Sequence, residues 1–154
     1  MPTLRDAAIA DAATIAEFNC RLAWETEHKR LDPVTINAGV AAVLARPELG
    51  RYFVAASETD GAIVGQLMIT YEWSDWRNGL FWWIQSVYVR DDWRGRGVFR
   101  SLHEHVARLA RETPGTCGLR LYVEHANQRA QAVYQKLGMV PSGHLLYETD
   151  WSGK

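Results

Sequence analysis

The chain has 154 residues, of which 47% are hydrophobic and 23% charged, and its formal net charge is −1. This balance is typical of one globular domain, and we expect a single domain over residues 1–154. A charge so close to zero argues against a general nucleic-acid or membrane-surface binder, because both need a positive field.

The sequence shows no features of a secreted, disulfide-bonded or metal-binding protein. The chain begins without the apolar run of a signal peptide, and its two cysteines, Cys20 and Cys117, are far apart, so we expect a cytoplasmic protein with free thiols. His103 and His105 fall on different faces of one predicted helix and do not form a metal pair. We therefore expect no metal site.

The first third of the chain predicts a short strand and two helices. The strand covers Thr3–Arg5, and Asp11 is placed to cap the helix that follows. Asp32-Pro33 is an N-cap and first-turn pair for a second helix that ends near Arg46-Pro47.

The middle of the chain predicts strands joined by turns. We expect strands over Arg51–Ser57, Ala62–Tyr71 and Leu80–Val89, with turns at Glu58–Gly61 and Asn78-Gly79. The last of these strands, LFWWIQSVYV, is apolar nearly throughout, which is typical of a central strand covered on both faces.

The last third of the chain predicts a helix, a strand, a second helix and a final strand, in that order. Gly97 opens a helix that Pro114-Gly115 ends, and Leu119–Glu124 forms a strand. Asn127 caps a helix to about Leu137, and a final strand covers His144–Asp150. The predicted order is β-α-α-β-β-β-α-β-α-β, a mixed sheet of the α/β class.

The stretch Val87–Arg100 is a strand, a short turn and a glycine-rich entry into a helix. Gly95 and Gly97 lack side chains, so backbone N–H groups at the helix start can close on an anion. The helix dipole adds positive charge there, and Arg94 and Arg96 add more. A glycine turn with solvated arginines is the structural alternative, but the flanking strand and helix favour a pyrophosphate site.

Two other phosphate motifs fit this stretch less well. A Walker A loop is excluded, because the only Gly-Lys pair is Gly153-Lys154. A dinucleotide fingerprint needs a third glycine where Arg100 stands. Glu124 could mimic its ribose-binding acid, so a dinucleotide-binding protein stays an open alternative.

Two motifs in the right order resemble those of the GNAT acetyltransferase superfamily. Arg94-Gly-Arg-Gly-Val98 resembles its Q/R-x-x-G-x-G/A acetyl-CoA motif, and Asn127–Met139 is similar to its N-x-x-A-x-x-x-Y-x-x-x-G-F/M motif. Leu4–Ala7 and Asp11–Ala13 look like the family's first strand and helix. Phe99 departs from the motif's final small residue, so the packing beneath the turn must differ.

The resemblance implies a GNAT fold and acetyl-CoA as cosubstrate. The backbone of the central strand would pair with the pantetheine arm, the turn would hold the diphosphate, and an asparagine would bond the cofactor near its reactive end. The implied cofactor-binding residues are Val87, Tyr88, Val89, Arg94, Gly95, Arg96, Gly97, Val98, Phe99, Arg100, Asn127 and Tyr134.

Tyr134 is the implied catalytic residue. When the tetrahedral intermediate collapses, coenzyme A leaves as a thiolate, and a phenol held against the sulfur can supply a proton. The alternative is that Tyr134 borders the apolar face of its helix. We expect direct attack by an amine in a ternary complex, with the oxyanion met by a backbone N–H of the central strand.

The acceptor must lose a proton, since an alkylamine is mostly charged at pH 7. Glu72–Gly79 and the strand after it look like those of the diamine acetyltransferase branch. That branch has a glutamate where this chain has Gln85, which cannot act as a base. The other candidates for the substrate site are acidic, imidazole or aromatic side chains: Glu25, Glu27, His28, Glu72, Trp73 and Asp75.

These residues favour a small cationic amine as the acceptor. The sequence therefore predicts an N-acetyltransferase for such a substrate. Many members of the family form dimers, so the resemblance also allows a homodimer. A non-catalytic sensor or scaffold that binds acetyl-CoA is the alternative.

Overall fold

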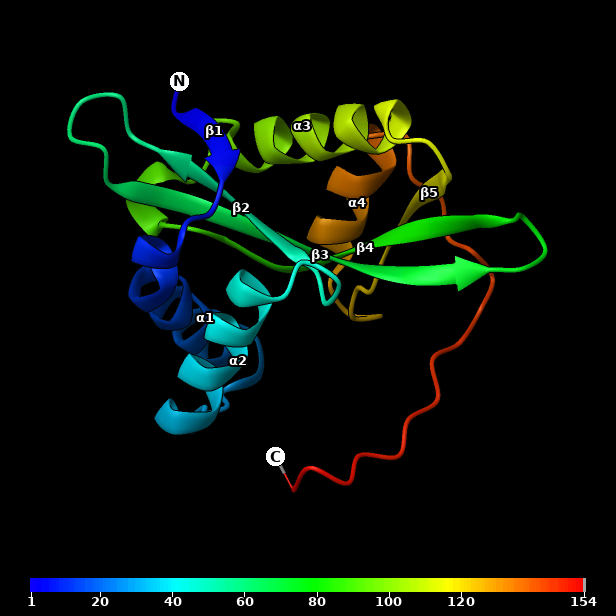
Figure 1. Cartoon of the computed structure of the whole chain (residues 1–154), viewed down its shortest axis with the longest axis horizontal. Helices are drawn as coiled ribbons and strands as arrows, with labels where there is room; N and C mark the ends of the chain where they lie inside the picture. The colour runs from blue at the N-terminus through cyan, green and yellow to red at the C-terminus, as the bar shows by residue number, and fades with distance from the viewer. Residues whose placement is uncertain (154) are drawn as a thin grey trace. The chain divides into compact units, whose positions relative to one another are not determined.

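The computed structural model describes residues 1–153, and the chain separates into two compact units, Met1–Leu121 and the residues from Tyr122 onward. The first unit holds the sheet and three of the helices (Figure 1). Its elements are β1 (Thr3–Asp6), α1 (Ala12–Glu27), α2 (Pro33–Ala45), β2 (Arg51–Ala56), β3 (Ile63–Ser74), β4 (Gly79–Val89), α3 (Val98–Glu112) and β5 (Thr116–Leu121), with short 3₁₀ turns at Ile9–Asp11 and Asp91–Trp93.

The sheet has five strands in the order β1-β2-β3-β4-β5. The first four pair antiparallel, whereas β5 runs parallel to β4. A parallel neighbour needs a crossover connection, and α3 supplies it. The predicted mixed sheet of the α/β class is confirmed.

Helices cover both faces of the sheet, and the alternation of side chains along β2 shows how. Phe53 and Ala55 are buried in a core with Leu102 and Val106 of α3. Tyr52, Val54 and Ala56 face the other way and pack with buried residues of α1 and α2. Accordingly α3 lies on one face of the sheet and α1 with α2 on the other (Figure 1).

The strand β4 contains a β-bulge. Gln66 of β3 is paired with Tyr88 and Met68 with Gln85, so one β3 residue stands opposite both Ser86 and Val87. Ser86 takes a left-handed backbone conformation with φ 50°. The extra residue changes the phase of β4, and Tyr88 is thereby buried on the α1 side, 4.9 Å from the Phe18 ring.

The predicted N-cap of α2 is confirmed, whereas that of α1 is wrong. Asp32 accepts a hydrogen bond from the Thr35 N–H at 2.9 Å, and Pro33 is the first residue of α2, as predicted. Asp11 directly precedes α1 but does not cap it. Its carboxylate accepts instead from the Ala8 N–H and from Arg5, both at 2.7 Å, and so closes the turn before the helix.

The boundaries of two strands, β3 and β5, were predicted wrongly. In both cases the boundaries depend on pairing with β4, which the local sequence does not show. The strand β3 continues to Ser74, since its ladder runs on to the pair Ser74–Gly79, and Trp73 therefore lies in a strand and not in a loop. The strand β5 begins at Thr116, directly after the Gly115 turn, and ends at Leu121. The sequence alone had placed it over Leu119–Glu124.

The second unit contains α4 (Gln128–Lys136). Asn127 caps α4 as predicted, accepting a hydrogen bond from the Ala130 N–H at 3.1 Å. The predicted strand over His144–Asp150 is wrong: these residues have no regular structure and are exposed. A strand forms only where its backbone groups pair with another strand. The described part of this unit contains no other strand with which these residues could pair.

None of the helices in residues 1–153 has both the length and the apolar character needed to cross a membrane.

Candidate active site

The turn that leads from β4 into α3 contains two glycines in the left-handed region. Gly95 has φ 76° and Gly97, the N-cap of α3, has φ 80°. A Cβ atom at either position would meet no atom within 4 Å, so the backbone conformation and not crowding requires glycine here. The result is a bare stretch of backbone at the N-terminus of a 15-residue helix, a geometry suited to a phosphate.

The first turn of α3 lies very close to the sheet. A Cβ atom at Gly65 of β3 would come 2.9 Å from Val98 Cγ1, so only glycine permits this approach. Phe99, the departure from the family motif, is partly buried against the core between α3 and the sheet. Its ring lies 6.1 Å from that of His103, one helical turn further along.

The arginines around the turn differ in their partners. Arg90 is paired with Asp92 at 2.6 Å and Arg100 with Glu104 at 2.9 Å, both neighbours in sequence. Arg96 stacks over the Trp93 ring at 5.1 Å. Of these three, only Arg96 has no ion pair within residues 1–153, so its charge is the most available to an anion.

Arg94 is held by a residue far away in sequence. Its Nη2 atom lies 2.8 Å from Glu25 Oε2 at the end of α1, and its Nε donates to the Val89 carbonyl at 2.8 Å. The same guanidinium stacks over the Tyr88 ring at 5.2 Å. Burial raises the pKa of the Tyr88 phenol, so this group stays neutral at physiological pH.

The second half of β4 extends beyond its pairing with β5. The parallel pairing ends at Ile84–Leu121, while β4 itself continues to Val89. Among residues 1–153 no strand pairs with Gln85–Val89 on the β5 side. The backbone of this half-strand, which includes Val87 and Val89, is therefore placed to dock an extended amide-bearing arm as an added strand.

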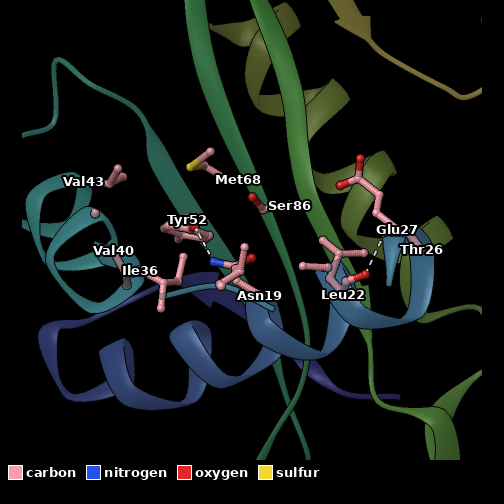
Figure 2. A pocket seen from close by; sticks show the side chains of 13 residues that line it. Asn19, Leu22, Thr26, Glu27, Ile36, Val40, Val43, Tyr52, Met68 and Ser86 are labelled. Carbon is pink, nitrogen blue, oxygen red and sulfur yellow. Dashed lines mark hydrogen bonds between the residues drawn. The ribbon is translucent and has the colours of Figure 1, made fainter. Parts of the chain in front are cut away.

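A cavity of about 440 Å³ lies on the opposite face from α3, between α1, α2 and the sheet. Figure 2 shows its two ends: Ile36, Val40 and Val43 at the apolar end, and Thr26 with Glu27 at the other. Glu27 is the acidic residue in its lining. The remaining walls come from Asn19, Leu22, Ala23, Leu31, Gly39, Tyr52, Met68 and the bulge residue Ser86.

A group of hydrogen-bonded polar side chains lies next to the bulge, and Asn19 and Tyr52 of this group line the cavity. The Asn19 side-chain amide donates to the Tyr52 hydroxyl at 3.0 Å, as the dashed line in Figure 2 marks. Gln66 Nε2 donates to Asn19 Oδ1 at 3.0 Å and to the Ser86 carbonyl at 3.1 Å. Burial raises the pKa of the Tyr52 phenol, and hydrogen bonds from Asn19 and Ser86 oppose this only in part.

The residues predicted for the acceptor site lie at several places. Glu27 lines the cavity, while Glu25 pairs with Arg94. His28 ends α1 in a left-handed conformation with its ring against Trp24. Gln85 donates to the Thr70 hydroxyl.

The other three predicted acceptor residues come from the β3–β4 hairpin and are not part of the cavity lining. Glu72 accepts from Arg120 and from the Trp83 indole. Trp73 is exposed, and Asp75 accepts from the Trp76 N–H in the hairpin turn.

Asn127 and Tyr134, the predicted residues of the second unit, lie at the start and within the last turn of α4. The Asn127 side chain caps the helix, and Tyr134 is half-buried. Burial raises the pKa of the Tyr134 phenol, so it is fully protonated at neutral pH.

Sequence reasoning missed the polar residues next to the bulge: Asn19, Tyr52, Gln66 and Ser86. Asn19 and Gln66 had one signal, a polar residue within an otherwise apolar face or strand. Ser86 had none, because a bulge depends on the register between two strands.

Comparison with known proteins identifies the family. Residues 11–139 match the Acetyltransferase (GNAT) family. The crystal structure of a possible acetyltransferase from Clostridium difficile 630 is 42% identical in sequence, the match covers 96% of each chain, and the two structures superimpose with a TM-score of 0.90.

Two characterised relatives are more distant. An L-methionine sulfoximine/L-methionine sulfone acetyltransferase of Pseudomonas paraeruginosa is 29% identical over 93% of this chain and 83% of its own. A thialysine N-epsilon-acetyltransferase of Bos taurus is 32% identical over 54% of this chain and 49% of its own.

The chain belongs to the GNAT acetyltransferase family, and it is an acetyltransferase of that family. Membership implies acetyl-CoA as the cosubstrate. The glycine turn, the arginines and the open half of β4 fit such a molecule, since they offer bare amide groups, positive charge and an unpaired backbone edge.

Proposed function

We propose that this enzyme transfers the acetyl group of acetyl-CoA to a primary amine of a small cationic substrate by direct attack in a ternary complex. The observation that supports it is the position of β4. The cavity reaches this strand at Ser86, and the glycine turn follows its end after Val89. A donor bound along β4 and an acceptor in the cavity would therefore meet at the bulge.

In this proposal the turn holds the diphosphate of the cofactor. Backbone N–H groups from Arg94 to Phe99 surround it, and Arg94, Arg96 and Arg100 supply charge. The pantetheine arm pairs with the backbone of Val87–Val89. Asn127 hydrogen-bonds the cofactor near its reactive end.

The lining of the cavity supports the class of acceptor. Its apolar walls suit an alkyl arm, and its volume of about 440 Å³ suits a small molecule. Glu27 at one end favours a cationic group. The substrates in the names of the two relatives, amino-acid derivatives that carry amines, are compatible with such a cavity.

The charged amine must lose two protons before it becomes an amide, and the departing thiolate must gain one. An amine with a pKa of about 10.4 costs roughly 4.6 kcal/mol to deprotonate at pH 7, so a water chain from the cavity must assist. Attack forms the C–N bond, and collapse breaks the C–S bond. Tyr134 gives its proton to the departing thiolate, and the second proton, which the nitrogen loses as the amide forms, passes through water to restore the phenol.

An acceptor screen tests the proposal. Purified protein with acetyl-CoA is offered diamines, lysine-like amino acids, uncharged amines and a peptide N-terminus, and released coenzyme A is read with a thiol reagent. We expect turnover with small cationic amines. Glu27→Gln should raise KM for them about tenfold, whereas Glu17→Gln, an exposed residue of α1 paired with Arg21, should not.

Turnover only with uncharged amines or peptides would contradict the proposed acceptor class. Saturable binding of acetyl-CoA without turnover on any amine would favour the sensor alternative.

A further inference from the structure

The bulge of β4 is held by a side chain of the neighbouring strand. Ser86, at φ 50°, occupies a region that favours glycine, so its conformation must be stabilised by its surroundings. The Ser86 carbonyl accepts a hydrogen bond from Gln66 Nε2 at 3.1 Å. Gln66 is fully buried, with an exposed fraction of 0%.

The orientation of the Gln66 amide follows from its partners. A backbone carbonyl can only accept, so the nitrogen and not the oxygen of Gln66 must face Ser86. The same nitrogen donates to Asn19 Oδ1 at 3.0 Å, and Asn19 in turn donates to Tyr52. These bonds fix Gln66, and Gln66 fixes the peptide between Ser86 and Val87.

That peptide has a second polar group, the Val87 N–H. The chain contains no cis peptide bond within residues 1–153, and the C=O and N–H groups of a trans peptide point in opposite directions. Because the Ser86 oxygen accepts from the Gln66 side chain, the Val87 N–H points away from that side chain. It belongs to the half of β4 that extends beyond the pairing with β5, along which the cofactor lies in the proposed function.

Stability alone does not account for a glutamine at this position. Gln66 Oε1 is buried and has no hydrogen-bond partner within residues 1–153. An unsatisfied buried oxygen is unfavourable, and such a group calls for a reason. A glutamine at this position can orient a peptide of the central strand, which an apolar residue could not do.

We propose that Gln66 is a positioning residue, which holds the Ser86–Val87 peptide so that the Val87 N–H donates to the thioester carbonyl of acetyl-CoA. This inference rests on the proposed function, in which the cofactor lies along β4. The carbonyl oxygen gains negative charge as the amine attacks, so a fixed donor accelerates the reaction. Gln66 itself touches neither reactant.

The test uses the full chain and acetyl-CoA labelled with ¹³C at the carbonyl. Infrared difference spectra give the carbonyl stretching frequency of the bound thioester, which falls when the oxygen accepts a hydrogen bond. Gln66→Met keeps the length of the side chain and removes the donor. Thr70→Val, which breaks the Gln85–Thr70 hydrogen bond of the same two strands, is the matched control.

We expect a lowered carbonyl frequency in the wild type and in Thr70→Val, and the frequency of unbound acetyl-CoA in Gln66→Met. The kcat of Gln66→Met should fall about 10²-fold, the effect of losing one oxyanion donor, with the Kd for coenzyme A unchanged. If Gln66→Met does not fold, Gln66→Leu replaces it in the same comparison.

The outcomes separate this inference from the function on which it rests. A wild-type frequency in Gln66→Met would overturn the role of Gln66 and leave the proposed function intact. An equal rise in the Kd for coenzyme A and acetyl-CoA, with no change of the band, would mean that Gln66 is merely structural. A wild-type protein that does not bind acetyl-CoA would overturn both.

Discussion

Arg94 and Glu25 form an ion pair of 2.8 Å that joins the glycine turn to the end of α1, although the two residues are 69 positions apart. The arginine that the family motif assigns to the diphosphate is thus held by a carboxylate. Its Nε is bonded to the Val89 carbonyl, one of the groups predicted to pair with the pantetheine arm. In the proposed complex the cofactor therefore competes for both interactions.

Glu25→Gln should therefore bind acetyl-CoA more tightly than the wild type. The pair is solvent-exposed, so its net contribution is at most about 1 kcal/mol and the gain in affinity about fivefold or less. Arg94→Gln should weaken binding. Calorimetric titration with acetyl-CoA measures both, and Glu17→Gln on the same helix is the control. Weaker binding by Glu25→Gln would show that Glu25 assists the cofactor.

Gly97 and Gly39 should respond to alanine in opposite ways. Gly97→Ala forces a Cβ into the left-handed region and should lower the free energy of unfolding by about 1–2 kcal/mol, with weaker acetyl-CoA binding. Gly39 lies within α2, where a Cβ atom meets nothing within 4 Å. Gly39→Ala should therefore raise the free energy of unfolding by about 0.5–1 kcal/mol.

Urea unfolding measures these changes. Because Gly39 lines the cavity, its alanine variant should also raise KM for the acceptor and leave the Kd for acetyl-CoA unchanged. A Gly97→Ala variant as stable as the wild type would contradict the left-handed turn.

Tyr134→Phe should lower kcat by about 10²–10⁴-fold, the contribution of a general acid, while the Kd for acetyl-CoA stays the same. Burial raises the pKa of this phenol above its ordinary value near 10. The phenol is therefore protonated throughout the neutral range, and the acid role should be lost only as the pH rises above that value.

A pH profile of kcat checks this expectation. Tyr147→Phe, an exposed residue of the same unit, is the control. Should Tyr134→Phe retain its turnover, another group or water protonates the thiolate.

The parts of the fold that local chemistry determines could be predicted from the sequence. Asp32-Pro33 marks the start of α2, and Gly97 the start of α3, because caps and turns depend on a few adjacent residues. The glycine turn after β4 belongs to this group, since its glycines, its arginines and a helix start lie within one short segment.

The parts that depend on pairing could not be predicted. The lengths of β3 and β5 follow from their register with β4, and the bulge at Ser86 follows from a mismatch of one residue between two strands. The cavity brings Asn19, Tyr52 and Ser86 together from three separate elements. The prediction of a strand at His144–Asp150 was wrong for a related reason. The residue types in a segment can favour a strand, but they do not show whether another strand lies beside it.

The last turn of α1 borders two places at once. Glu25 pairs with Arg94 of the glycine turn, while the next two residues, Thr26 and Glu27, line the cavity. In the proposed complex the diphosphate competes with Glu25 for Arg94, so this helical turn keeps only the hydrogen bond from the Tyr88 hydroxyl to Glu25 at 3.4 Å, and the wall of the cavity can adjust around an amine. Such a link favours a fixed sequence of arrival, with the nucleotide thioester first and the amine second.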